Sequence, residues 1–225
     1  MTGMALKVRD LVVKGDQGRD LLSVANFDAS PGEVVVVRGP SGAGKSTLLF
    51  ALAGLIKPQT GSIRWGETDL VGMSDHARTA FRRTAIGFTF QDHLLFDELG
   101  AVGNASLAGA FAPRRNRSNH KAQATALLHH LKVSPEQRSV ASYSGGERQR
   151  IAVARAMAAD PPVILADEPT ANLDREAANH LIDDLMALAD RNRTVIIVSH
   201  DAALHARATR LASVIDGKVR VAARV

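Results

Sequence analysis

The chain has 225 residues, of which 45% are hydrophobic and 23% are charged, as in a single globular domain with a substantial core. It contains no cysteine, which excludes disulfide scaffolds, thiolate metal sites, iron–sulfur clusters and thiol catalysis. Its 28 lysines and arginines outnumber its 23 aspartates and glutamates. This excess favours an anionic partner and does not say whether it is a nucleotide, a membrane surface or a nucleic acid.

The sequence contains no stretch close to the roughly 20 unbroken apolar residues that a membrane-spanning helix needs. The start, Met1 to Met4, lacks the pattern of a signal peptide. We therefore expect the chain to stay in the compartment in which it is made.

The first third of the chain predicts β-structure. Three strand-like runs, 6–13, 21–28 and 34–37, are separated by glycine- and proline-containing turns. A glycine-rich turn and an apolar helix over 45–55 follow, and a short strand is expected over 63–65.

A helical pattern then extends from residue 102 to residue 130, interrupted by a basic loop over 113–117. Ser118 is the expected N-cap of the next helix. The basic loop has two interpretations: a solvated loop, which is the usual fate of a short charge run, or a contact with anionic lipid headgroups.

Two short and fully apolar runs, 163–166 and 195–198, each follow a helix, as buried parallel strands of an α/β sheet do. The segment 214–219 contains Asp216 and Gly217, which predict a closing hairpin.

A phosphate-binding loop is predicted between the third strand and the first helix. The segment Gly39-Pro40-Ser41-Gly42-Ala43-Gly44-Lys45-Ser46 fits the pattern G-x-x-x-x-G-K-[ST]. Backbone N–H groups and the helix N-terminus would bind phosphates, Lys45 would reach the β and γ oxygens, and the Ser46 hydroxyl would bind Mg²⁺. A glycine turn with an unrelated lysine is the alternative, and the order of strand, loop and helix counts against it.

Asp167 and Glu168 form an acidic pair at the end of the apolar run 163–166, where α/β sheets place their ligands. Asp167 would hold Mg²⁺ through a water molecule. Glu168 could orient or deprotonate an attacking water, a role worth typically about 10²–10⁴-fold in rate. The alternative for Glu168 is a helix-capping acid before Pro169.

The segment Ser144-Gly145-Gly146-Glu147, followed by Arg148-Gln149-Arg150 and a helix over 151–158, resembles the signature sequence of ATP-binding-cassette (ABC) ATPases. Ser144 suits an N-cap, and the helix start would present backbone N–H groups to a γ-phosphate. The landmarks of that family follow in its order across nearly the whole chain: 39–47, Gln91, 144–147, Asp167 with Glu168, 172–174 and 199–200.

The resemblance implies a role for each matching residue. Gln91 would touch Mg²⁺ and the attacking water, His200 would contact the γ-phosphate, and Asp174 would cross to a second subunit. The residues implied to contact ATP are Gly39, Pro40, Ser41, Gly42, Ala43, Gly44, Lys45, Ser46, Thr47, Ser144, Gly145, Gly146, Glu147 and Asp174. The residues implied to lie near Mg²⁺ are Ser46, Gln91 and Asp167. The implied catalytic residues are Glu168, His200, Gln91 and Lys45.

The resemblance also implies the architecture. The implied fold is an α/β P-loop NTPase of ABC type, with one cassette over 1–225. It would have a mixed and mostly parallel sheet core, an N-terminal antiparallel β-subdomain and a helical subdomain over roughly 92–158. Two cassettes would form a homodimer around ATP. They would drive a separate integral membrane protein from the cytoplasmic face of the membrane, with no nucleic acid expected as a partner.

The segments 165–174 and 90–95 look like the lipoprotein-release, macrolide-export and cell-division branch of the family. There the membrane partner works more as a mechanical lever than as a tunnel.

Two positions depart from the family pattern. Members usually stack adenine on an aromatic residue after the first strand, but residues 14–20 contain none. Phe27 fits the strand core, so Val13 or Leu21 would cover the base. Tyr143 stands where leucine is commoner, and it should be tolerated as an amphipathic substitute.

Other nucleotide-binding classes fit less well. The sequence has no Asn-Lys-x-Asp motif for guanine, and a small-molecule kinase would leave the signature unexplained. A soluble nucleic-acid-linked cassette remains the alternative. It would need a long coiled coil or a zinc insertion, and the segment between Gln91 and Ser144 shows no sustained heptad.

Overall fold

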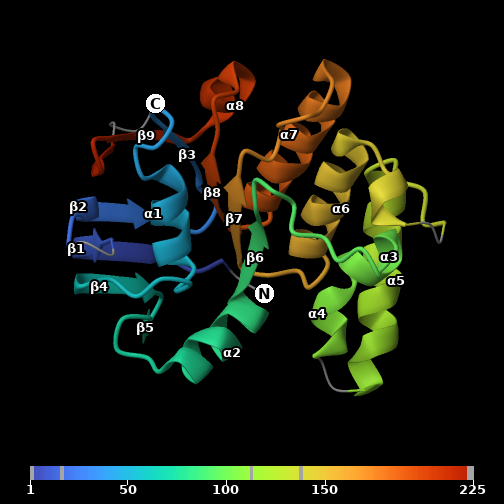
Figure 1. The fold of residues 1–225 in the computed structure, drawn as a ribbon, viewed down its shortest axis with the longest axis horizontal. Coiled ribbons are helices and arrows are strands. Elements are labelled where there is room, and N and C mark those ends of the chain that lie inside the picture. The colour runs from blue at the N-terminus through green and yellow to red at the C-terminus, as the bar shows by residue number, and fades with distance from the viewer. Residues whose placement is uncertain (1–2, 16–17, 112–113, 137–138, 222–225) are drawn as a thin grey trace.

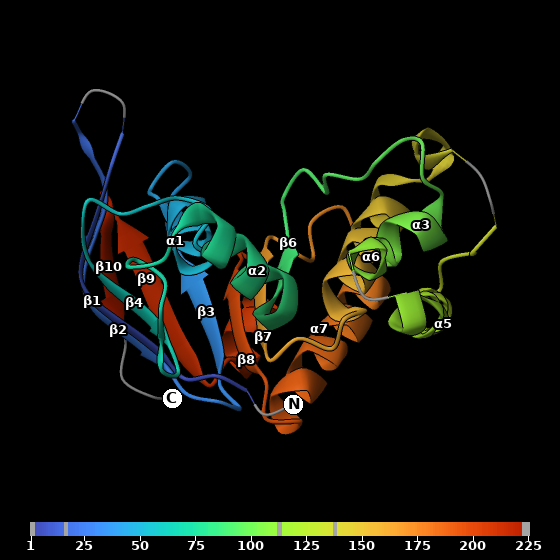
Figure 2. The same cartoon turned by 90° about the horizontal axis from the view of Figure 1, so that it is seen from below.

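The computed structural model describes residues 3–15, 18–111, 114–136 and 139–221, without the side chains of 114–116. It contains a ten-stranded sheet in the order β5-β4-β1-β2-β10-β9-β3-β8-β7-β6 (Figures 1 and 2). The sheet combines a parallel half with an antiparallel half, so the expected mixed α/β architecture is confirmed.

The parallel half carries the functional loops. Neighbouring strands run parallel from β9 to β6: β9 (Arg210–Ile215), β3 (Val34–Arg38), β8 (Thr194–Val198), β7 (Val163–Asp167) and β6 (Ile86–Thr89). Because all these strands point the same way, their carboxyl ends meet at one edge of the sheet.

Alternate side chains of these strands enter two different cores. Val35, Leu165 and Ile196 pack in the core that includes α1 (Lys45–Leu52). Their neighbours Val36 and Ile164 pack in the core that includes α7 (Arg175–Asp190) and α6 (Gly145–Met157). Burial on both faces explains why these strands are continuous apolar runs.

The antiparallel half consists of β1 (Leu6–Lys14), β2 (Asp20–Ala29), β4 (Thr60–Trp65) and β5 (Thr68–Asp69). The strand β10 (Lys218–Val221) joins the halves, because it pairs antiparallel with β9 and meets β2 at Ser23. Asp216 and Gly217 have φ of 48° and 72°, the left-handed pair that a tight hairpin requires. The expected closing hairpin is confirmed.

The single tryptophan links the two halves around α1. Trp65, on β4, is fully buried, and its indole N–H donates to the carbonyl of Leu52 at 2.9 Å. Leu52 is the last residue of α1. The helix that begins at Lys45 is therefore tied at its far end to the antiparallel strands.

The remaining helices gather beyond β6, on the side away from β1 and β2 (Figures 1 and 2). They are α3 (Ala101–Ala105), α4 (Leu107–Ala110) and α5 (Arg114–His130), with the 3-10 turn Val140–Ser142 before α6. Two further helices, α2 (Asp75–Ala85) and α8 (Ala202–Arg207), precede β6 and β9. Within the described ranges, no helix is long and apolar enough to cross a membrane.

The basic segment differs from the prediction. Residues 114–117 form the first turn of α5 rather than a loop, so Ser118 lies inside the helix and is not its N-cap. Arginine has a high intrinsic helix propensity, so a run of arginines can extend a helix. Residue 113 lies outside the described residues.

Candidate active site

The phosphate loop, residues 39–47, connects β3 to α1 and is shaped by close backbone contacts. A Cβ atom on Gly39 would lie 2.1 Å from the carbonyl oxygen of Val214 on β9. Gly44 is the N-cap of α1 with φ of 102°, and no side chain caps this helix. The first N–H groups of α1 are therefore left for an anion, as at other phosphate-binding helix starts.

Lys45 folds back across the loop. Its ammonium donates to the carbonyl oxygens of Gly39 and Pro40, both at 2.8 Å. Two of its three protons are used in this way, and its side chain lies inside the curve of the loop. The lysine is thus positioned to neutralise phosphate oxygens bound there.

Asp167 ends β7 and is only 3% exposed. Burial raises the pKa of its carboxyl above the ordinary value of 3.8, while a hydrogen bond from Ser46 and the charge of Lys45 act in the opposite direction. The contact with Ser46 brings the phosphate loop against the end of β7. A carboxylate and a hydroxyl are oxygen ligands of the kind that Mg²⁺ prefers, so these residues fit the ion.

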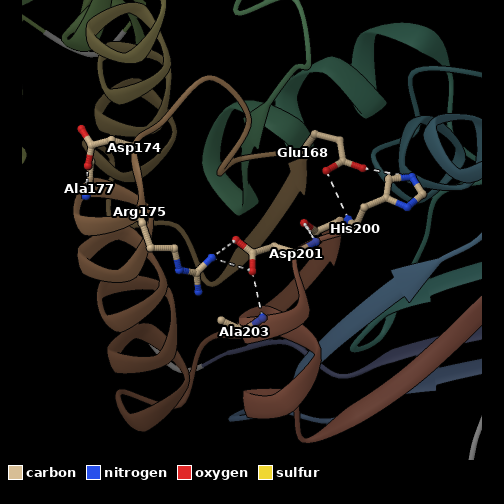
Figure 3. Close-up of polar contacts among 8 residues, drawn as sticks. Glu168, Asp174, Arg175, Ala177, His200, Asp201 and Ala203 are labelled. Atoms are coloured by element: carbon tan, nitrogen blue, oxygen red, sulfur yellow. Dashed lines mark hydrogen bonds and ion pairs between the residues drawn. The ribbon is translucent and has the colours of Figure 1, made fainter.

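Glu168 directly follows β7 in a left-handed conformation, with φ of 48°. Its N–H donates to the carbonyl of Val198, at the end of β8, at 2.9 Å. Its carboxylate lies beside His200, with Oε1 3.5 Å from the imidazole Nε2 and Oε2 3.4 Å from the backbone nitrogen (Figure 3). A bend away from the strand direction therefore brings the acid to the histidine.

These elements enclose a cavity of about 490 Å³. Gln91, which follows β6, reaches the same cavity, so the expected catalytic residues all converge there. The lining comprises Leu21, Ser41, Gly42, Gly44, Lys45, Ser46, Thr47, Gln91, Asp167, Glu168, Ala171, Val198 and His200.

The signature residues and Asp174 lie outside this cavity. Ser144 caps α6 by accepting from the N–H of Glu147 at 3.2 Å, and the Glu147 carboxylate accepts from the N–H of Ser144 at 2.8 Å. Asp174 likewise caps α7 by accepting from the N–H of Ala177 at 2.9 Å (Figure 3). One chain alone does not bring these residues to its own phosphate loop.

The structure separates the two candidates for covering the base. Val13 is 3% exposed, whereas Leu21 is 42% exposed and lines the cavity. Val13 pairs with Leu22 across the β1–β2 ladder, and successive residues of a strand point to opposite faces. Leu21 therefore faces outward, next to the phosphate loop, while Phe27 is buried in the core as expected.

Tyr143 has the surroundings of an amphipathic residue. It is 3% exposed, and its hydroxyl donates to the carbonyl of Glu136 at 3.0 Å. A buried ring with a satisfied hydroxyl is the usual arrangement for tyrosine.

The sequence did not reveal an ion pair beside the site. Arg175, the first residue of α7, lies 3.2 Å from the carboxylate of Asp201, which caps α8 through the N–H of Ala203 (Figure 3). Asp201 directly follows His200, so the pair ties the histidine's loop to α7. An aspartate just before a helix was the available signal, but its partner 26 residues away was not.

Comparisons with known proteins agree with this geometry. The family model for ABC transporters matches residues 22–171. The lipoprotein-releasing system ATP-binding protein LolD of Granulibacter bethesdensis is 40% identical over 91% of this chain and 90% of its own length. The macrolide export ATP-binding/permease protein MacB of Sodalis glossinidius is 36% identical over 92% of this chain and 32% of its own length.

Solved structures agree as well. The dimeric structure of MJ0796, a bacterial ABC transporter cassette, matches with a TM-score of 0.88 and 30% identity, covering 96% of each chain. A dimeric post-hydrolysis state of the same cassette, bound to ADP and Pi, also matches with a TM-score of 0.88.

Proposed function

Because the chain belongs to the ABC transporter family and is an ATPase of that family, we propose that it is the ATP-hydrolysing subunit of a membrane-bound machine. In this proposal two copies close around ATP, and hydrolysis releases them. The observation that carries the proposal is the convergence of the phosphate loop, Asp167, Glu168 and His200 on one cavity.

The chain's own residues supply the binding of the triphosphate. The N-terminus of α1 and the loop N–H groups would hold the phosphates, and Lys45 would exchange loop carbonyls for β and γ oxygens. Asp167, Ser46 and Gln91 would hold Mg²⁺, which offsets charge on the phosphates when bound.

Glu168 is the group that would accept a proton from the attacking water. The imidazole of His200 is close enough to interact with this carboxylate and exposed enough to reach the γ-phosphate, since its side chain is 60% exposed. A positioned acceptor of this kind contributes about 10²–10⁴-fold to a rate. The pair would thus orient the water and contact the phosphate that leaves.

The location of the signature residues supports a shared site. Ser144 is exposed at the start of α6 and lies outside its own chain's cavity. The capping box uses the N–H groups of Ser144 and Glu147, so the N–H groups of Gly145 and Gly146 are the ones left for a phosphate. A second cassette could place this start opposite the phosphate loop, so that each ATP contacts both chains. The dimeric structures of the related cassette support this arrangement.

The membrane partner and the branch of the family are also part of the proposal. Relatives named for lipoprotein release and for macrolide export match over more than nine tenths of this chain. We therefore assign the chain to a peripheral position at the cytoplasmic face of a membrane, driving a separate integral membrane protein. These relatives do not favour a nucleic-acid-linked cassette.

The test of this function is Glu168→Gln. The amide keeps the shape of the side chain but cannot accept a proton, so ATP should still bind while hydrolysis stops. Size-exclusion chromatography with ATP and Mg²⁺ should then show a stable dimer, while the parent chain returns to monomer as it hydrolyses ATP. A variant that hydrolyses ATP at the parent rate would remove Glu168 from the mechanism.

A further inference from the structure

Gln149 is a fully buried polar residue on the signature helix α6. Its neighbours along the helix that face the core are isoleucine, alanine and valine, among them Ile151 and Val153. A buried amide costs free energy unless it is hydrogen-bonded. The contacts of Gln149 therefore show what the residue is placed to hold.

The amide of Gln149 holds the backbone that follows the catalytic glutamate. Its Nε2 donates to the carbonyl of Pro169 at 2.9 Å and lies 3.5 Å from the carbonyl of Glu168. These carbonyls belong to the turn in which Glu168 has φ of 48°. A left-handed residue other than glycine persists where its surroundings hold it in place, and this side chain is part of those surroundings.

Gln149 also faces the turn that follows Gln91. Burial of the His93 ring lowers the pKa of its imidazole. The contact with the Gln149 side chain acts in the opposite direction and is the weaker of the two effects. Gln149 Oε1 and His93 Nε2 are both buried and, over the part of the chain that is described, neither has a hydrogen-bond partner within normal geometry.

The same helix grips this second turn with an arginine. Arg155 donates to the carbonyls of His93 and Leu94 at 2.6 and 2.5 Å, and both of those residues have positive φ. The start of α6 packs on the segment after Glu168 as well, since a Cβ on Gly146 would lie 3.1 Å from the carbonyl of Asn172. One helix thus contacts both turns that bring acidic and amide groups to the cavity.

We propose that Gln149 is a positioning residue for ATP hydrolysis. It fixes the Glu168–Pro169 backbone to α6, so that the Glu168 carboxylate is aimed at the attacking water only when this helix is in place. This inference rests on the proposed function, because it assumes that Glu168 is the proton acceptor and that α6 faces the ATP of a second subunit.

Gln149→Leu tests the proposal, since leucine keeps much of the volume but donates no hydrogen bond. Losing one aimed hydrogen bond should lower kcat by about tenfold or more, while KM and ATP affinity stay within about twofold. Gln123→Leu, on the exposed surface of α5, makes the same change away from the site and should leave kcat unchanged. An unchanged kcat in Gln149→Leu would overturn the proposal.

A second measurement separates positioning of Glu168 from damage to α6. In the Glu168→Gln background, adding Gln149→Leu should preserve the ATP-dependent dimer. Loss of that dimer would show that Gln149 maintains the structure of the α6 start that faces the partner, and would overturn the proposal. If the parent chain itself failed to hydrolyse ATP, the proposed function would fail instead, which is a different result.

Gln149→Glu is a second variant that tests the same hydrogen bond if Gln149→Leu does not fold. A carboxylate cannot donate to the carbonyl of Pro169, but a protonated carboxyl can, and burial favours the protonated form. The kcat of Gln149→Glu relative to the parent should therefore rise as pH falls, while the ratio for Gln149→Leu stays flat. Equal pH profiles for the two variants would overturn the role of the donated proton.

Discussion

The imidazole Nε2 of His200 lies 3.5 Å from Oε1 of Glu168, and the two residues follow neighbouring parallel strands. The backbone nitrogen of His200 also lies 3.4 Å from Oε2. The Glu168 carboxylate therefore contacts both the imidazole and the backbone nitrogen of His200. A substitution of His200 removes the first contact and keeps the second.

His200→Ala should lower kcat by about 10²-fold, as loss of one aimed donor at a reacting centre does. ATP affinity should change little, because the phosphate loop is untouched. Steady-state kinetics and equilibrium binding would check this, with His129→Ala on the exposed face of α5 as the matched control. A parent-like kcat would remove the imidazole from the mechanism.

Lys45→Ala should abolish tight ATP binding, with a loss of at least about 10²-fold, since a charge-assisted contact to the β and γ oxygens disappears. Isothermal titration would measure the affinity, and thermal unfolding would confirm that the variant is folded. Lys57→Ala changes an exposed lysine beyond the end of α1 and should bind ATP normally. Unchanged affinity in Lys45→Ala would contradict the assignment of the phosphate loop.

Leu21 offers the base an aliphatic surface, so recognition should rest mainly on the phosphates. GTP should then compete with ATP within roughly tenfold, or about 1.4 kcal/mol. Leu21→Tyr should raise ATP affinity several-fold, because stacking on an aromatic ring is worth about 1–3 kcal/mol per base. Leu55→Tyr is the matched control, since Leu55 is 43% exposed and Leu21 is 42% exposed.

A competition assay with both nucleotides would decide this point. A preference for ATP far above tenfold in the parent chain would show that another side chain reads the base. An equal gain from Leu21→Tyr and Leu55→Tyr would show that the ring does not act at the base.

The raised pKa of Asp167 gives the site a pH dependence with a definite sign. Mg²⁺ binds the ionised carboxylate, so the part of ATP affinity that depends on Mg²⁺ is present above the folded-state pKa and is lost as pH falls through it. Burial places that pKa above 3.8, so the loss should begin at a higher pH than for an ordinary aspartate.

Binding measured with Mg²⁺ and with a chelator at each pH isolates this effect. Asp167→Asn keeps Ser46 and Gln91 but has no carboxyl at this position, so its smaller Mg²⁺ contribution should lack the pH dependence that Asp167 gives. The same variant corrects for the protonation of ATP itself. A contribution of Mg²⁺ that stays constant until the parent chain unfolds would contradict the role of Asp167.

Shared sites predict that two inactive variants can restore activity when mixed. Homodimers of Lys45→Ala, or of Ser144→Arg, have two damaged sites and should not hydrolyse ATP. In a mixed dimer both lesions fall in one site and the other is intact, so ATPase activity should return if one site can act alone. Differential tags would confirm that mixed dimers form.

A double variant provides the control for that mixture. A chain carrying both substitutions, paired with a parent chain, has one lesion in each shared site and should be inactive. Sites built within one chain would instead leave the parent subunit active. Activity in this pairing, together with no recovery in the first mixture, would rule out sharing.

The parts of the fold that could be predicted are those encoded by adjacent residues. Apolar runs such as 163–166 and 195–198 predicted the buried strands, and the phosphate loop and the acidic pair followed from their spacing. Arg114 shows the limit of local patterns, because it belongs to a charged run that predicts a loop but begins a helix.

The candidate site was predictable as a set of residues but not as a geometry. The choice between Val13 and Leu21 depended on which face of the sheet each side chain occupies, and so on the register of β1 with β2. Gln149 and Arg155 contact backbone that lies 19 to 62 positions away. A polar residue on the buried face of a helix was the only local signal, and it did not say what the side chain would hold.

The position of Trp65 has a practical consequence. Its buried indole is hydrogen-bonded to Leu52, at the end of α1 opposite the phosphate loop. The chain has no other tryptophan. Tryptophan fluorescence, excited at a wavelength that Tyr143 does not absorb, therefore comes from a single residue at the end of the helix that starts at Lys45. A red shift on denaturation would report when water reaches that contact. Comparing this transition with the loss of helical circular dichroism would show whether the antiparallel strands and the helical subdomain unfold together or in separate steps.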